Sequence, residues 1–266
     1  MSDHQLFSLP GDCPWYKNVY HYTVTDSTNT RAKLLARQGV PHGTVVLADQ
    51  QTGGRGRMGR QFDSPAGLGI YLSVILRPNC PPDQLMHLTC AVAVAMCDAV
   101  ETVTGHRPGV KWINDLVFGN RKLGGILTEL SLDTATGLTE YAVIGIGINC
   151  NQHLADFPPS LQDMATSLAV VTGQPVSRQA LTAAMIHALW QMSERLLIDK
   201  QHLMTRYRAD CITLGKPVAV HSANGIRHGN ALSLDDDGAL VVQYTDGQLQ
   251  TVASGEVSVR GLYGYI

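Results

Sequence analysis

The feature that most constrains the fold of this chain is a glycine-rich loop that no helix can follow. The loop reads Gly54-x-Gly56-x-x-Gly59 and comes directly after a strand-like segment. This spacing is found where a dinucleotide-binding sheet turns into a helix whose N-terminus faces a pyrophosphate. Pro65 and Gly67 would break such a helix within two turns. The sequence therefore argues against a Rossmann-type domain.

The hydrophobic pattern of residues 1–210 predicts a mixture of helices and hairpin-like strands, which is an α+β domain. Strands are predicted at 19–25, 44–48, 69–76, 110–112, 116–118, 123–130 and 141–148. Asp26-Ser27-Thr28 predicts a helix cap before a helix that reaches Arg37, and further helices are predicted over 83–104 and 178–208. Residues 1–18 are predicted to be an irregular lead-in. Residues 49–68 are predicted to form a long loop, which in a compact domain is typical of a functional segment.

The pattern changes near residue 211, where short alternating segments replace the long elements. They are separated by Asn224-Gly225, Asp237-Gly238 and Asp246-Gly247, and such dipeptides between apolar alternations are typical of tight hairpins. Strands are predicted at 218–220, 229–234, 239–244, 248–253 and 256–260. We therefore expect a larger domain over 1–210 and a small antiparallel β-barrel over 211–266.

Composition excludes several classes of protein. The chain is 44% hydrophobic with a net charge of −2 and a pI near 6.5, whereas nucleic-acid-binding proteins usually carry a basic excess. The first residues lack the basic and apolar regions of a signal peptide, and the longest apolar run, Cys90–Cys97, is far short of the roughly 20 residues of a membrane span. We expect a cytoplasmic protein without a membrane or nucleic-acid partner. None of the six cysteines is in a metal-binding or redox spacing, so they are predicted to be buried thiols.

The glycine-rich loop also carries Arg55, Arg57 and Arg60. Glycines let backbone N–H groups approach a ligand closely, and arginines supply planar, permanently charged forks for phosphate or carboxylate. Such a loop suits an anionic, adenylate-type ligand, although a solvated basic loop or a nucleic-acid contact has the same composition. A P-loop is absent, because Gly215-Lys216 is followed by Pro217 instead of Ser or Thr.

Five blocks in order resemble the motifs of the biotin–protein ligase family. They are Asp26-Ser27-Thr28-Asn29, the loop from Ala48 to Arg60, Val110-Lys111-Trp112-Ile113-Asn114-Asp115, Arg121 to Glu129 (RKLGGILTE) and Gly145-Ile146-Gly147-Ile148-Asn149. The resemblance implies a mixed-sheet catalytic domain of the biotin/lipoate ligase type with a C-terminal SH3-like β-barrel. It also implies a two-step reaction, in which ATP and biotin give biotinyl-5′-AMP and pyrophosphate. The biotinyl group then passes to a lysine of a biotin carboxyl carrier protein.

The resemblance also assigns roles to residues. Lys122 is expected to contact the biotin carboxylate and the α-phosphate, and it is the first candidate for catalysis with Arg57 and Asp115. The biotin contacts implied are Ser27, Thr28, Asn29, Gln51, Arg55, Gly56, Arg57 and Lys122. The ATP or adenylate contacts implied are Arg55, Arg57, Arg60, Asn114, Lys122 and Asn149. Asp115 is expected to help hold Mg²⁺ or to orient the incoming lysine.

Alternatives to these assignments stay open. Asn114-Asp115 is also a common turn pair, Ser27-Thr28 is also a helix cap, and Trp112 is expected to be a core residue. A lipoate–protein ligase shares the chemistry, but the arginine loop and the Lys-Trp-x-Asn-Asp segment favour biotin.

Two positions depart from the family pattern, and the start of the chain differs from the repressor members. Ile113 and Phe62 replace the family's usual proline and tryptophan, and we expect packing changes there. About 25 residues precede the Asp26 turn, too few for the repressors' DNA-binding module, so we expect no repressor activity. The resemblance leaves a homodimer open.

Overall fold

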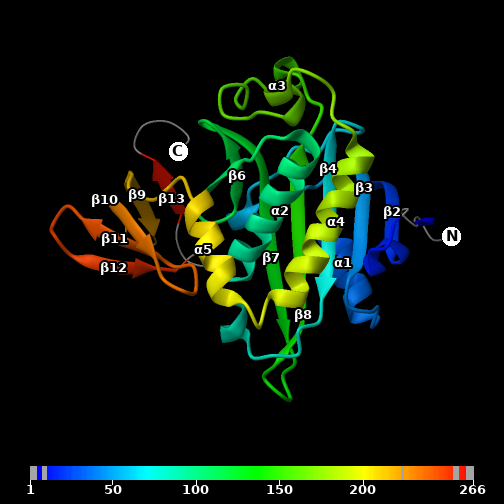
Figure 1. The fold of residues 1–266 in the computed structure, drawn as a ribbon, viewed down its shortest axis with the longest axis horizontal. Helices are drawn as coiled ribbons and strands as arrows, with labels where there is room; N and C mark the ends of the chain where they lie inside the picture. Colours follow the sequence, from blue (N-terminus) through cyan, green and yellow to red (C-terminus); the bar gives the residue numbers. More distant parts are fainter. Residues whose placement is uncertain (1–4, 8–10, 223–224, 254–257, 262–266) are drawn as a thin grey trace.

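The computed structural model describes residues 5–7, 11–222, 225–253 and 258–261. Its larger part is built on an eight-stranded mixed sheet in the order β1-β2-β3-β4-β8-β7-β6-β5 (Figure 1). The strands are β1 (Gln5–Phe7), β2 (Val19–Thr25), β3 (Thr44–Gln51), β4 (Gly69–Leu76), β5 (Gly109–Lys111), β6 (Asp115–Phe118), β7 (Arg121–Leu132) and β8 (Thr139–Asn149). Among these strands β2 and β3 pair in parallel and the other neighbours pair antiparallel. The predicted α+β class is confirmed.

Helices cover both faces of this sheet. On one face α1 (Thr28–Arg37) packs against β3, β4 and β8. On the other face lie α2 (Leu88–Thr104), α4 (Arg178–Arg195) and α5 (Lys200–Asp210), with α2 in contact with both α4 and α5 (Figure 1). Since both faces are covered, every residue of the central strand β4 is buried. The burial of both faces explains why the sequence of this strand is a continuous apolar run.

The apolar helix α2 is the centre of the core. Within the described part of the chain, Pro82–Thr104 is the one segment long and apolar enough to cross a membrane by length and composition. In the fold, α2 instead packs between the sheet and two helices, and most of its side chains are buried. Its composition is therefore that of a core helix. Gly105 ends it in the left-handed conformation (φ 71°) as predicted, but it begins five residues later than predicted, because Pro82–Leu85 forms a 3-10 turn.

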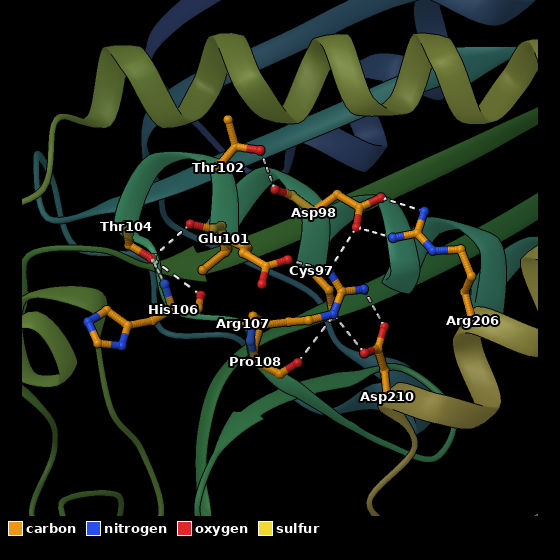
Figure 2. A network of polar contacts seen from close by, with 11 residues as sticks. Cys97, Asp98, Glu101, Thr102, Thr104, His106, Arg107, Pro108, Arg206 and Asp210 are labelled. Carbon is orange, nitrogen blue, oxygen red and sulfur yellow. Dashed lines mark hydrogen bonds and ion pairs between the residues drawn. The ribbon is translucent and has the colours of Figure 1, made fainter.

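An ionic network ties α2 to α5 and to the segment before β5 (Figure 2). Arg107 donates two hydrogen bonds to Asp210, at 2.8 and 2.6 Å, and single ones to Asp98 and Glu101, both at 2.8 Å. Arg206 also donates to Asp98. Hydrogen bonds to Asp210, and then to the other carboxylates, raise the pKa of Arg107. The network fixes the start of β5, the strand that carries Lys111.

The C-terminal strands form a separate antiparallel sheet in the order β12-β11-β10-β9-β13. They are β9 (Pro217–Ser222), β10 (Gly225–Leu234), β11 (Leu240–Tyr244), β12 (Leu249–Val252) and β13 (Ser258–Gly261). The predicted strands are confirmed, and the sheet is consistent with the expected SH3-like barrel. No ladder joins β12 to β13 in the described residues, so the sheet is not closed. Asn224 of the first predicted turn, and Glu256 and Val257 at the start of the last predicted strand, lie outside the described residues.

Three predictions of local structure were wrong. The segment 178–208 is two helices, because the chain turns at 196–199 and directs α5 toward the C-terminal sheet, where Lys200 pairs with Asp237 and Arg208 with Asp236. The lead-in contains β1, which pairs with β2, and a 3-10 turn whose Trp15 is buried. The predicted loop is shorter at its start, since β3 runs on to Gln51. A short helix, α3 (Leu168–Thr172), was not predicted.

Candidate active site

The glycine–arginine loop is a tight hairpin in the structure. The Phe62 N–H donates to Gly54 O at 2.9 Å, the Gly56 N–H donates to Arg60 O at 2.7 Å, and Arg55 lies opposite Gln61. The chain reverses at Met58 and Gly59, which have φ values of 55° and 73°. The hairpin therefore presents Arg57 near its tip and Arg55 near its base.

The base of the hairpin is joined to the start of α1. Gln51 Oε1 accepts hydrogen bonds from the Thr28 N–H at 2.8 Å and the Thr28 hydroxyl at 3.1 Å, and Gln51 Nε2 donates to Ser64 Oγ at 2.9 Å. Ser27 occupies the cap position, but its side chain makes no capping hydrogen bond. The predicted cap position is confirmed, but Gln51, in place of the Ser27 side chain, accepts from a backbone N–H at the helix N-terminus. The structure brings together the expected biotin contacts Ser27, Thr28 and Gln51.

Asn29 is buried on the α1 face of the sheet. Its Oδ1 lies 2.6 Å from Ser73 Oγ, and its Nδ2 donates to Glu129 Oε2 at 2.9 Å. The side chain fits there because Gly145 has none: a Cβ on Gly145 would lie 1.9 Å from Asn29 Oδ1. The glycine of the Gly145–Asn149 block is therefore explained by the close approach of Asn29.

A second cluster lies where β6 meets β7. Lys122 Nζ donates to Asp115 Oδ1 at 2.6 Å, and their side chains are 29% and 15% exposed. A Cβ on Gly125, opposite Asp115, would lie 3.2 Å from Lys122 Nζ and 3.4 Å from Asp115 Oδ1, so glycine there leaves room for the pair. Two candidates chosen from sequence, Lys122 and Asp115, are in direct contact.

The tip of the hairpin reaches this cluster through Arg57. Arg57 donates to Asn114 Oδ1 at 3.0 Å, and Asn114 Nδ2 donates to Ile126 O at 2.9 Å. Burial lowers the pKa of Arg57, the charge of Asp115 raises it, and that of Arg60 lowers it. Asn114 is thus more than a turn former, because it links the hairpin to β7.

Lys111, for which the motifs predict no role, belongs to the same cluster. Burial lowers the pKa of Lys111 to about 8, the charge of Asp115 opposes this shift, and the charges of Lys122, Arg60 and Arg260 add to it. Its position inside the Val110–Asp115 block was the signal that could have found it.

The C-terminal sheet faces the same cluster. On paired antiparallel strands, residues directly opposite each other point to the same face. Ser258 is opposite His221 and Arg260 is opposite Ala219, so His221 and Arg260 share a face. The charges of Arg260 and Arg60 both lower the pKa of His221, after burial. Arg260 of the second sheet therefore lies close enough to Lys111 and His221 to lower the pKa values of both.

The remaining expected contact, Asn149, is buried and bonded within the protein. Its Nδ2 donates to Thr166 O at 3.0 Å, and its Oδ1 accepts from Gln152 at 3.3 Å. Thr166 in turn donates its backbone N–H to Lys122 O at 2.8 Å. Asn149 therefore supports the segment beside Lys122.

Both departures from the family pattern lie in packed positions. Ile113 is buried beside Trp112, and Trp112 is a core residue as predicted, with its Nε1 donating to Gly238 O at 2.8 Å. Phe62 packs on Gly147, where a Cβ would lie 2.5 Å from the ring. All six cysteines are free and buried, as predicted.

Comparisons with known proteins agree with this arrangement. The model of the biotin/lipoate A/B protein ligase family matches residues 21–149, and that of the biotin protein ligase C-terminal domain matches residues 213–260. The bifunctional ligase/repressor BirA of Bacillus subtilis is 34% identical over 245 residues, which cover 91% of this chain and 73% of that protein. The biotin–[acetyl-CoA-carboxylase] ligase of Paracoccus denitrificans is 31% identical, and the match covers 89% of this chain and 98% of that protein.

A solved structure extends the similarity to three dimensions. The biotin protein ligase of Aquifex aeolicus in complex with biotin and ATP superposes with a TM-score of 0.78 at 29% identity, covering 92% of this chain and 99% of that one. Similarity at this level extends over both sheets.

Proposed function

This chain belongs to the biotin/lipoate A/B protein ligase family and is an ATP-dependent biotin protein ligase, and we propose that the cluster around Lys122 and Asp115 is its reaction centre. The reaction joins two anions, the biotin carboxylate and the α-phosphate of ATP, to give biotinyl-5′-AMP and pyrophosphate. Positive charge fixed at that point lowers the barrier, because it opposes the repulsion and stabilises developing charge. The Lys122–Asp115 contact of 2.6 Å is the observation that carries the proposal.

In this proposal each cation has a place. Asp115 holds the Lys122 ammonium in position, and Lys122 donates to the biotin carboxylate and the α-phosphate. Arg57, Arg60 and Lys111 bind the phosphates. Asn114 holds Arg57, and Asn149 holds the segment beside Lys122. Two observations support these roles. Arg57 donates a hydrogen bond to Asn114, and the charge of Arg60 lowers the pKa values of Arg57 and Lys111.

Biotin would lie between the start of α1 and the base of the hairpin. Ser27, Thr28, Asn29 and Gln51 are polar, and the first three are buried, so their orientations are fixed before a ligand arrives. Backbone groups of Arg55 and Gly56 lie on the adjoining strand of the hairpin. Preorganised polar groups in a largely apolar wall are typical of sites for small acids.

Mg²⁺ would enter this site with ATP. The described residues contain no group of three or more His, Cys, Asp or Glu that could hold a metal, and Asp115 offers one carboxylate. Mg²⁺ usually takes one or two protein carboxylates and completes its shell with phosphate oxygens and water, so Asp115 fits such a role. The ion would neutralise the charge of the phosphates, and the protein side chains would hold the phosphates in position.

In the second step, the ε-amine of a carrier lysine attacks the mixed anhydride and releases AMP. We propose a biotin carboxyl carrier protein as the acceptor and the cytoplasm as the place of action. We also propose a division of the chain near residue 211. A homodimer, the lack of nucleic-acid binding and the lack of repressor activity stay predictions, which sedimentation and a gel shift would test.

Calorimetric titration with biotin and with lipoate separates the two possible acids. We expect biotin to bind, and MgATP with biotin to release pyrophosphate in the absence of an acceptor. Lipoate binding without biotin binding would overturn the proposal.

A further inference from the structure

Glu129 on β7 is a carboxylate that no step of the reaction uses. Its Oε1 pairs with Lys33 of α1 and lies 3.5 Å from a terminal nitrogen of Arg55, and its Oε2 accepts from Asn29 at 2.9 Å. Its side chain is 24% exposed. Burial would raise the pKa of Glu129, but hydrogen bonds from Lys33 and Asn29 and the charge of Arg55 lower it. The group is therefore held ionised, with three partners from two separate segments.

These contacts join the hairpin to the helix that would hold biotin. Arg55 lies on the strand of the hairpin that leads out of the base, whereas Lys33 and Asn29 belong to α1. Arg57, near the tip, is bound separately by Asn114. The hairpin is thus fixed to the sheet at two points, one at each end.

The two points lie at different residues of β7, because Asn114 bonds to Ile126 O whereas Arg55 pairs with Glu129. Ile126 is three residues from Glu129, and Lys122 Nζ would lie 3.2 Å from a Cβ on Gly125, which is four residues from Glu129, or roughly 13 Å at about 3.3 Å per residue of extended strand. Lys122 Nζ pairs with Asp115, whereas the guanidinium of Arg55 is held by a different carboxylate, Glu129. The charge of Arg55 is occupied in anchoring the loop.

We propose that Glu129 is a positioning residue that anchors the base of the glycine–arginine hairpin over biotin through Arg55 and Asn29, and that the Arg55 side chain serves as this anchor and not as a phosphate ligand. The proposal rests on the proposed function, because it assigns the anchored end of the hairpin to biotin and the Arg57 end to ATP. When the contact between Glu129 and Arg55 is lost, the base of the hairpin holds biotin and biotinyl-5′-AMP less tightly. The tip of the hairpin keeps the hydrogen bond from Arg57 to Asn114.

The test is a double-mutant cycle on Glu129→Gln and Arg55→Gln, read by steady-state pyrophosphate release. Glutamine at 129 keeps a neutral acceptor for Asn29 but loses the charge that pairs with Arg55 and Lys33. We expect each single variant to raise KM for biotin about tenfold, as for loss of a charge-assisted contact, and to shorten the retention of biotinyl-5′-AMP, with KM for ATP unchanged. The double variant should be no worse than either single one.

Two control variants make the result specific, and one of the test variants guards against misfolding. Glu140→Gln changes an exposed carboxylate of β8 that accepts from Ser131, and it should behave as the wild type. Arg57→Ala should raise KM for ATP and not KM for biotin, which is the reverse of the effect expected for the two test variants. Arg55 is half exposed, so Arg55→Gln gives a reading even where Glu129→Gln fails to fold.

Three outcomes would each overturn the inference. They are a wild-type KM for biotin in both single variants, a rise in KM for ATP in Arg55→Gln, and additive effects in the double variant. A wild-type protein that makes no biotinyl-5′-AMP would instead refute the proposed function, so the two failures are distinguishable.

Discussion

Raising the pH from about 7 to about 9 is expected to weaken ATP binding about tenfold, because it removes the charge of Lys111. Burial sets the pKa of this lysine at about 8. The ammonium is therefore present below that pH and is lost as the pH rises through it. Bound phosphate favours the charged form and raises the pKa of Lys111, so ATP binding at high pH must take up a proton.

The magnitude follows from the fraction of charged lysine. With a pKa of about 8 in the free protein, about nine-tenths of Lys111 is charged at about pH 7 and about one-tenth at about pH 9. If the bound form stays protonated over this range, KM for ATP rises by the ratio of these fractions, which is about tenfold. KM for biotin should stay nearly constant, since biotin would lie toward the other end of the hairpin.

The assay is pyrophosphate release as a function of ATP concentration at each pH, with biotin saturating. Lys111→Arg is the matched control, because a guanidinium keeps its charge over the whole range, so its KM for ATP should be flat. Lys111→Met should have a raised KM for ATP at every pH. A flat wild-type profile, or the same rise in Lys111→Arg, would show that the charge of Lys111 does not control ATP binding.

Three further changes have defined outcomes. Lys122→Ala should slow biotinyl-5′-AMP formation by about 100-fold or more without changing the circular dichroism spectrum, and a near wild-type rate would remove its role. Gly145→Ala should weaken biotin binding in calorimetry, because the new Cβ would lie 1.9 Å from Asn29 Oδ1; unchanged affinity would contradict that. Arg107→Met should lower the free energy of unfolding by about 2 kcal/mol in urea, since Asp210, which is 10% exposed, loses its two hydrogen bonds from Arg107 and Asp98 keeps only Arg206 as an ionic partner. A loss below about 0.5 kcal/mol would show that the network contributes little.

The strands and α1 could be predicted because each has a local cause. The run from Gly69 to Leu76 is apolar throughout because helices cover both faces of β4. Asp237-Gly238 and Asp246-Gly247 fix hairpin turns by backbone conformation alone, and both glycines have positive φ. The break between α4 and α5 has no comparable signal, since 196–199 contains neither glycine nor proline. That turn is associated with tertiary contacts of α5 to Asp236 and Asp237.

The residues of the candidate site could be predicted from the sequence, but the contacts between them could not. The motifs contain Lys122, Asp115, Arg57 and Asn114, and the fold brings these four together. The division of the loop arginines between two anchors, Glu129 and Asn114, depends on sheet register and is invisible in the sequence. The convergence of Arg260 with Lys111 likewise needs the placement of the second sheet.

The decisive measurement is the transfer of biotin to an acceptor lysine, because this is the reaction proposed for the protein. The protein is incubated with biotin, MgATP and a biotin carboxyl carrier domain, and the products are read by streptavidin blot. We predict labelling of the carrier that requires both biotin and ATP and disappears when the acceptor lysine is replaced by arginine. Absence of carrier labelling by the wild-type protein under these conditions would contradict the account.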